Sequence, residues 1–250
     1  VRLYGLGDYR TLDARLALAE ALAQPGRTGL QREALREAAR LNAGASREYN
    51  AGRPAAGIPS ARRALSLYKG VLGEESRDVA DSLNILAALH LAAGDRKAAL
   101  PLFEKAVAIR KRVLGEHHPD YADSLEALAL LLNSMGDRKA ALPLMEKALA
   151  VTKEALGEGH SDYAARLNSL ALILHFLGDD KASVPLLKEA LAVRKRVLGE
   201  RHPLYSDSLN NLGLLLLKLR NPRAALPLLE KALVIRKDVL GERHPGYATT

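Results

Sequence analysis

The chain has 250 residues, of which 48% are hydrophobic and 26% are charged, so it can form a sizeable core and is not a disordered segment. Only 4% of the residues are aromatic, and Trp and Cys are absent, which favours close-packed helices over strands and excludes disulfides, thiolate metal sites and cysteine nucleophiles. The net charge of +8 comes from Lys and Arg that are mixed with Asp and Glu, so we interpret it as a solvated basic surface.

The first 30 residues contain one predicted helix and no repeat. Apolar residues follow helical spacing from Leu12 to Ala23, and Pro25-Gly26 ends the pattern. The chain begins without Met or a signal-peptide pattern, and none of its apolar runs approaches the roughly 18 residues that a membrane span needs. We therefore expect residues 1–30 to be a cap or the end of a preceding domain in a longer protein. No membrane interaction is expected, and the cytoplasm is the favoured location.

A 42-residue period occupies the rest of the chain. The tripeptide Leu-Gly-Glu recurs at this spacing, beginning at Leu72, Leu114, Leu156, Leu198 and Leu240. Gly, Pro, His and Tyr residues keep the same phase. A fixed period of this length predicts a repeat architecture, with units at about 31–72, 73–114, 115–156, 157–198 and 199–240, followed at 241–250 by the start of a truncated further unit.

Each unit is predicted to be two helices joined by a tight turn. In the second unit, apolar residues recur at helical spacing over 79–93 and again over 96–114. Gly94 suits the left-handed residue that ends the first helix, and Asp95 can cap the amides that begin the second. Pro119 stands where the next unit begins its first helix, a position at which its missing N–H costs little.

One residue type conflicts with this interpretation. Pro101 lies inside the predicted second helix, where it should remove the hydrogen bond to the carbonyl of Lys97 and kink the helix. Pro recurs at the same position in the other units. We therefore expect every unit to tolerate it.

The small and large residues of the unit follow a known pattern. In the second unit they are Leu86, Ala87, Gly94, Ala99, Phe103 and Ala106. This pattern resembles the tetratricopeptide repeat, and the long period with the linker Leu-Gly-Glu-x-His-Pro resembles the repeats of kinesin light chains and of similar bacterial multidomain proteins. The resemblance implies an all-α fold, a right-handed α-α superhelix of stacked antiparallel hairpins, that serves as a non-catalytic scaffold for partner proteins.

The first helices of such a stack line its concave side, which is the usual binding surface of solenoids. The resemblance places three columns of polar residues there: Asn42, Asn84, Glu126, Asn168 and Asn210; Asp81, Asp123 and Asp207; and Asn133 with His175. A side-chain amide can pair with a peptide backbone of any sequence, so we expect the Asn column to contact an extended peptide. Alternatively, each Asn binds a neighbouring helix or water. The Asp column predicts a locally acidic groove and a basic element in the ligand.

Other kinds of site have weaker support. His118, His160, His202 and His244 are one linker position seen four times, so we interpret them as helix starts and not as metal ligands. The basic clusters lie near the ends of second helices, where they complement the helix dipole, and they lack the stacking aromatics of a nucleic-acid surface. No catalytic motif breaks the repeat. We therefore expect no enzyme activity, cofactor, metal or nucleic-acid ligand in this segment, and a small-molecule ligand is not favoured.

The sequence therefore predicts an interaction scaffold that holds a protein or peptide partner in its concave groove. The alternative is a structural, oligomerising or regulatory spacer within a larger signalling or effector protein. In that case the groove would be occupied by the protein's own chain, and the flanking sequence would distinguish the two.

Overall fold

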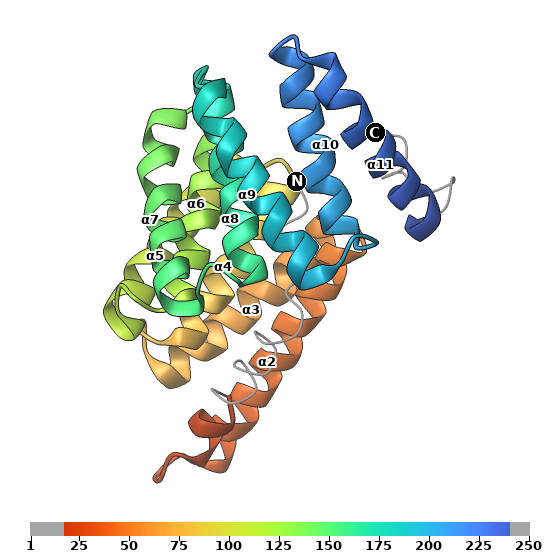
Figure 1. Cartoon of the computed structure of the whole chain (residues 1–250). Helices are drawn as coiled ribbons and strands as arrows, with labels where there is room; N and C mark the ends of the chain where they lie inside the picture. The colour runs from red at the N-terminus through yellow and green to blue at the C-terminus, as the bar shows by residue number, and fades with distance from the viewer. Residues whose placement is uncertain (1–17, 241–250) are drawn as a thin grey trace. The chain divides into compact units, whose positions relative to one another are not determined.

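The computed structural model describes residues 18–240, and every regular element in this range is a helix (Figure 1). This confirms the predicted all-α class. The predicted helix at Leu12 to Ala23 lies partly outside the described residues, of which 18–23 are helical. Residues 241–250, where we expect a further unit to begin, lie outside them.

Consecutive helices form hairpins, one within each 42-residue interval. Their bounds are α2 (Gly29–Asn50) with α3 (Pro54–Leu72), α4 (Arg77–Ala92) with α5 (Arg96–Leu114), α6 (Pro119–Ser134) with α7 (Arg138–Leu156), α8 (Ser161–Leu177) with α9 (Asp180–Leu198), and α10 (Pro203–Lys218) with α11 (Pro222–Leu240). The chain divides into two compact units, Val1–Glu116 with helices α2 to α5 and His117–Thr250 with helices α6 to α11. We describe each unit by itself.

The turns inside the hairpins α4–α5, α6–α7 and α8–α9 have the predicted chemistry, whereas the N-cap of α3, Arg53, makes no side-chain capping hydrogen bond. Gly94 adopts φ +88° after α4, a left-handed conformation that glycine reaches without a steric cost. The Asp95 side chain then accepts a hydrogen bond from the Ala98 N–H over 3.0 Å and caps α5. In the last hairpin Arg220 takes the glycine position and has φ +56°.

The linker histidines begin first helices, as the sequence predicted. His118 is the N-cap of α6, and its Nδ1 accepts the Asp120 N–H over 3.1 Å. His160 and His202 cap α8 and α10 in the same way, over 3.2 Å each. An imidazole nitrogen therefore takes the place of the usual Ser or Asp oxygen.

Proline inside the second helices does not end them. Pro101 lies within α5 and Pro143 within α7, and both helices continue to the Leu-Gly-Glu tripeptide. The missing hydrogen bond falls near the start of each helix, so most of the helix keeps its backbone ladder. The expected tolerance is confirmed.

Apolar residues from both helices of each hairpin form the core. In the first unit Leu35 and Leu83 pack with Tyr68 and Ile109. In the second unit Met145 packs with Leu170 and Ile173. Alanine fills the positions where helices approach most closely, and Ala87, Ala129 and Ala171 are buried. Small residues there allow close helix packing.

Candidate functional site

The first helices α8 and α10 of the second unit border a pocket of about 210 Å³. Its apolar lining comes mainly from Leu172 and Phe176 on α8 and from Leu214 and Leu215 on α10, with Leu187 of α9 beneath. Polar side chains at its rim are Asn168, His175, Asn211 and Lys218. A concave apolar surface with a few polar groups is the usual form of a binding site.

Three large apolar side chains at this pocket are exposed. Phe176 is 49% exposed, Leu214 is 50% exposed and Leu172 is 44% exposed. The Arg138 guanidinium lies 5.0 Å from the Phe176 ring centroid, a cation–π contact that holds the ring without burying it. Clustered apolar exposure of this kind marks interaction surfaces.

Polar groups at one end of the pocket form a charged cluster. His175 Nδ1 lies 2.6 Å from Asp180 Oδ1, and Lys218 Nζ lies 3.2 Å from Asp180 Oδ2. Hydrogen bonding from His175, and then from Lys218, lowers the pKa of Asp180 below its usual value. Asp180 therefore stays ionised and anchors the two basic side chains at the rim.

The Asn column faces its neighbouring first helix. Asn42 Nδ2 donates to Ser82 Oγ over 2.8 Å, and Asn168 Nδ2 donates to Ser208 Oγ over 3.2 Å and to the Ala164 carbonyl over 2.9 Å. Asn168 is only 6% exposed. At these two positions the geometry favours the alternative in which Asn joins adjacent helices. Direct contact between the column and a peptide stays a prediction.

The remaining predicted polar residues differ in their surroundings. Asn210 is buried on α10, whereas Asn84 and Asn133 are partly exposed on α4 and α6. Asn211, one residue beyond the column, is exposed, and its Nδ2 lies 3.5 Å from Asn168 Oδ1. The pocket therefore brings together His175 and Asn168 of the predicted residues.

The Asp column is neutralised by arginine. Arg110 Nη2 lies 2.6 Å from Asp81 Oδ1 in the first unit. In the second unit Arg236 Nη2 lies 2.9 Å from Asp207 Oδ1, and Arg166 Nη2 lies 2.6 Å from Asp123 Oδ1. Each of these carboxylates has a cationic partner, which weakens the local negative charge, and the basic element in the ligand stays a prediction.

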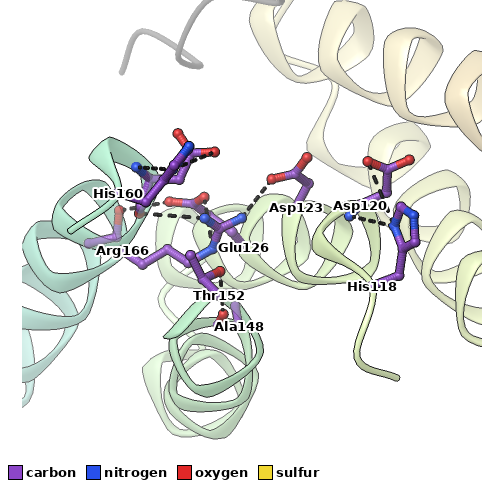
Figure 2. A network of polar contacts seen from close by, with 10 residues as sticks. His118, Asp120, Asp123, Glu126, Ala148, Thr152, His160 and Arg166 are labelled. Atoms are coloured by element: carbon purple, nitrogen blue, oxygen red, sulfur yellow. Dashed lines mark hydrogen bonds and ion pairs between the residues drawn. The ribbon is translucent and has the colours of Figure 1, made fainter. Parts of the chain in front are cut away.

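Figure 2 shows the Arg166 side chain reaching from α8 toward Asp123 and Glu126 of α6. Arg166 is only 1% exposed, and its Nε lies 3.7 Å from Glu126 Oε2. Glu126 Oε1 also accepts the Ser169 hydroxyl over 3.1 Å. Glu126, predicted to face a ligand, thus lies in a charged cluster between two first helices.

The pocket residues that the sequence did not predict include Phe176, Asn211 and Lys218. A comparison between repeats contains a signal for Phe176. Phe176 stands where the preceding repeats have Ala92 and Ser134, so a large aromatic residue replaces a small one. Arg166 was missed for a similar reason, since it replaces a buried serine.

No group of three or more His, Asp or Glu side chains within residues 18–240 has an arrangement that could hold a metal ion. No helix in the same range combines the length and apolarity needed to cross a membrane.

Solved structures of repeat proteins share the fold. The chain is similar to the nearly identical TPR-like repeats of a kinesin light chain-type protein from Podosopora anserina, with 23% identity and a TM-score of 0.69 over 80% of this chain and 95% of that one. It is also similar to BtubC (BKLC) from P. vanneervenii, with 20% identity and a TM-score of 0.64 over 92% and 94% of the two chains. MamA from Desulfovibrio magneticus RS-1 matches with 14% identity and a TM-score of 0.57 over 81% and 97%.

No curated protein matches the sequence. The tetratricopeptide repeat family model matches residues 35–112, 86–154, 128–196 and 162–238 in overlapping segments. These segments cover most of the chain, in the phase of the 42-residue period. The chain therefore belongs to the tetratricopeptide repeat family, and its structural neighbours include repeats of the kinesin light chain type.

Proposed function

We propose that the chain binds an extended segment of a partner protein on the first helices of its second unit. The family consists of non-catalytic repeat scaffolds, which support protein–protein interaction in general. The observation that carries the finer proposal is the pocket between α8 and α10, where Leu172, Phe176 and Leu214 remain exposed. An apolar partner side chain would fill this pocket.

The chemistry of the lining suits such an occupant. Full burial of an exposed leucine or phenylalanine side chain is worth about 1.5 to 3 kcal/mol, and covering a half-exposed one is worth about half of that. The three exposed residues together can therefore supply the core of a binding hot spot. The Asn211 amide at the rim can donate to and accept from the partner's backbone. The Asn column remains a proposed second contact with the partner's backbone, although Asn42 and Asn168 also bind serine hydroxyls.

The test begins with selection of peptides from a random display library on the full chain, followed by mapping of the bound residues. We expect enriched peptides to share one large apolar residue. The double variant Phe176→Ala and Leu214→Ala should weaken their binding by at least about tenfold, since each truncation removes buried apolar area. Binding can be measured by isothermal titration calorimetry or fluorescence polarisation.

A matched control separates the pocket from general stickiness. Val197 is 45% exposed on the second helix α9, outside the pocket lining. Val197→Ala should leave the affinity unchanged. Equal weakening by the control and the pocket variant, with both proteins folded by circular dichroism, would contradict the proposed site.

A further inference from the structure

One junction in the stack departs from the repeat at several positions together. Most first helices carry Asn in one column and Ser 40 residues later, as in Asn42 with Ser82 and Asn168 with Ser208. At the junction between α6 and α8 the corresponding pair is Glu126 with Arg166. A charged pair thus replaces a neutral hydrogen bond.

A second departure lies in the hairpin α6–α7. In the hairpins α4–α5 and α10–α11, the Asp of the first helix pairs with an Arg of the second, Asp81 with Arg110 and Asp207 with Arg236. The residue that corresponds to these arginines in α7 is Thr152, which has no charge and donates its hydroxyl to the Ala148 carbonyl over 2.8 Å (Figure 2). Asp123 therefore receives its cation from Arg166 of the next hairpin.

The hairpin α8–α9 is altered to match. Ala165 replaces the Asp that its second-helix arginine, Arg194, would otherwise bind. Arg194 Nη1 instead donates to the Leu204 carbonyl over 2.8 Å and to Ser208 Oγ over 2.9 Å. Hairpin α6–α7 thus lacks the arginine of the second helices α5, α9 and α11, and hairpin α8–α9 supplies an additional arginine, Arg166, from its first helix.

These substitutions should destabilise a stack in which hairpins follow one another in the wrong order. If α10–α11 followed α6–α7, Ser208 would face Asp123 and Glu126, and two poorly exposed carboxylates would lose the contact with the Arg166 guanidinium. If α8–α9 followed a hairpin like α4–α5, Arg166 would meet a carboxylate that already binds an arginine of its own hairpin. A buried charge without a partner is strongly destabilising.

We propose that Glu126, Thr152 and Arg166 form a register lock, which allows α8–α9 and no other hairpin of this chain to stack on α6–α7. Repeats with the same period are prone to misassembly and exchange between chains. Neutral Asn–Ser pairs do not distinguish one neighbour from another, because most of the units carry them. A buried ion pair at one junction distinguishes the correct order from its alternatives, as polar groups do in coiled coils.

The test uses the full chain and two main variants. Arg166→Ser removes the buried cation that contacts both Asp123 and Glu126, and its equilibrium constant for unfolding should rise by about a hundredfold or more. The triple variant Glu126→Asn, Thr152→Arg, Arg166→Ser converts the junction to the common pattern and should recover most of that loss. Urea denaturation gives the equilibrium constants, and hydrogen exchange in residues 119–198 localises the effect.

The lock itself is tested by refolding at increasing chain concentration, followed by size-exclusion chromatography. The triple variant should yield a several-fold larger fraction of exchanged dimer than the wild-type chain, although its stability is similar. Arg196→Ser, which removes an exposed arginine of α9, is the control and should behave as wild type. The proposal would be overturned if the equilibrium constant for unfolding of Arg166→Ser lay within about threefold of the wild-type value. It would also be overturned if the triple variant formed no more exchanged dimer than the wild-type chain.

Discussion

Asp78 in the first turn of α4 is partly buried beside a second carboxylate. Burial, and then the charge of Asp81, raises the pKa of Asp78 to about 6. Because the folded protein holds this proton more tightly than the unfolded chain, ionisation of Asp78 opposes folding. The penalty is absent below the unfolded pKa of about 4. It grows as the pH rises and is complete above the folded pKa.

Asp78→Asn should therefore stabilise the protein at neutral pH. Relative to wild type, the variant should gain about 1 to 3 kcal/mol in unfolding free energy between pH 4 and pH 7.5. Urea denaturation at the two pH values measures the difference. The control is Glu104→Gln, which removes an exposed carboxylate of α5. If Asp78→Asn showed the same pH dependence as this control, Asp78 would have an ordinary environment.

Asn168 and Asn211 offer a direct test of the two interpretations of the Asn column. Asn168→Ala removes the hydrogen bonds to Ser208 and to the Ala164 carbonyl, which should cost about 1 to 3 kcal/mol of stability. Asn211→Ala removes an exposed amide and should cost less than about 0.5 kcal/mol. Thermal and urea denaturation measure both. If Asn168→Ala reduced peptide affinity without any loss of stability, the column would be a ligand contact after all.

At the scale of the element, the hairpin turns depend on a left-handed residue between two helices. Glycine has this role after α4, α6 and α8, whereas Arg220 adopts φ +56° after α10. A non-glycine residue in this conformation costs roughly 1 to 2 kcal/mol. The Arg220 and Asn221 N–H groups still bind the Leu217 and Leu216 carbonyls, each over 2.9 Å. The turn therefore forms despite its strain.

Substitutions at two equivalent turns should have opposite effects. Arg220→Gly should stabilise the protein by about 1 kcal/mol, because it relieves the strain, and Gly136→Ala should destabilise it by a similar amount, because Gly136 has φ +90°. Differential scanning calorimetry of the two variants checks the signs. A loss of stability in Arg220→Gly would show that the arginine side chain outweighs the backbone strain.

At the scale of the whole molecule, each compact unit is built from hairpins that contact their neighbours along the chain, through α3 and α4 in the first unit and through α7 with α8 and α9 with α10 in the second. A solenoid of this kind gains stability from each hairpin and from each interface between hairpins. A chain truncated after Leu198 should therefore remain folded, with the same helicity per residue and a lower melting temperature. Far-ultraviolet circular dichroism during heating measures both quantities. Collapse of all helices in the truncated chain would contradict this local architecture.

Much of the fold could be predicted because its determinants lie close together in the sequence. Helical spacing, the Gly94-Asp95 turn and the His118 cap act over a few residues, and the 42-residue period reveals them several times. The tolerance of Pro101 could also be predicted, because each repeat contains the same exception. Each repeat can therefore be compared with the others at every equivalent position.

The candidate site was less predictable, because it depends on which residues face one another across hairpins. The amides of Asn42 and Asn168 could face a ligand or a helix, and only the tertiary structure shows that they donate to Ser82 and Ser208. Phe176 and Leu214 are apolar like the core, and only packing revealed that they remain exposed.

The sequence by itself determined the helices, their turns and the family, because local backbone preferences and a fixed period specify them. The tertiary structure decided the charge of the first-helix face and the partner of each polar residue. A carboxylate such as Asp123 is acidic in sequence, yet its effect depends on an arginine 43 residues away. Electrostatic pairing and burial act through space, so repeats with the same period still differ in the partners of their polar side chains.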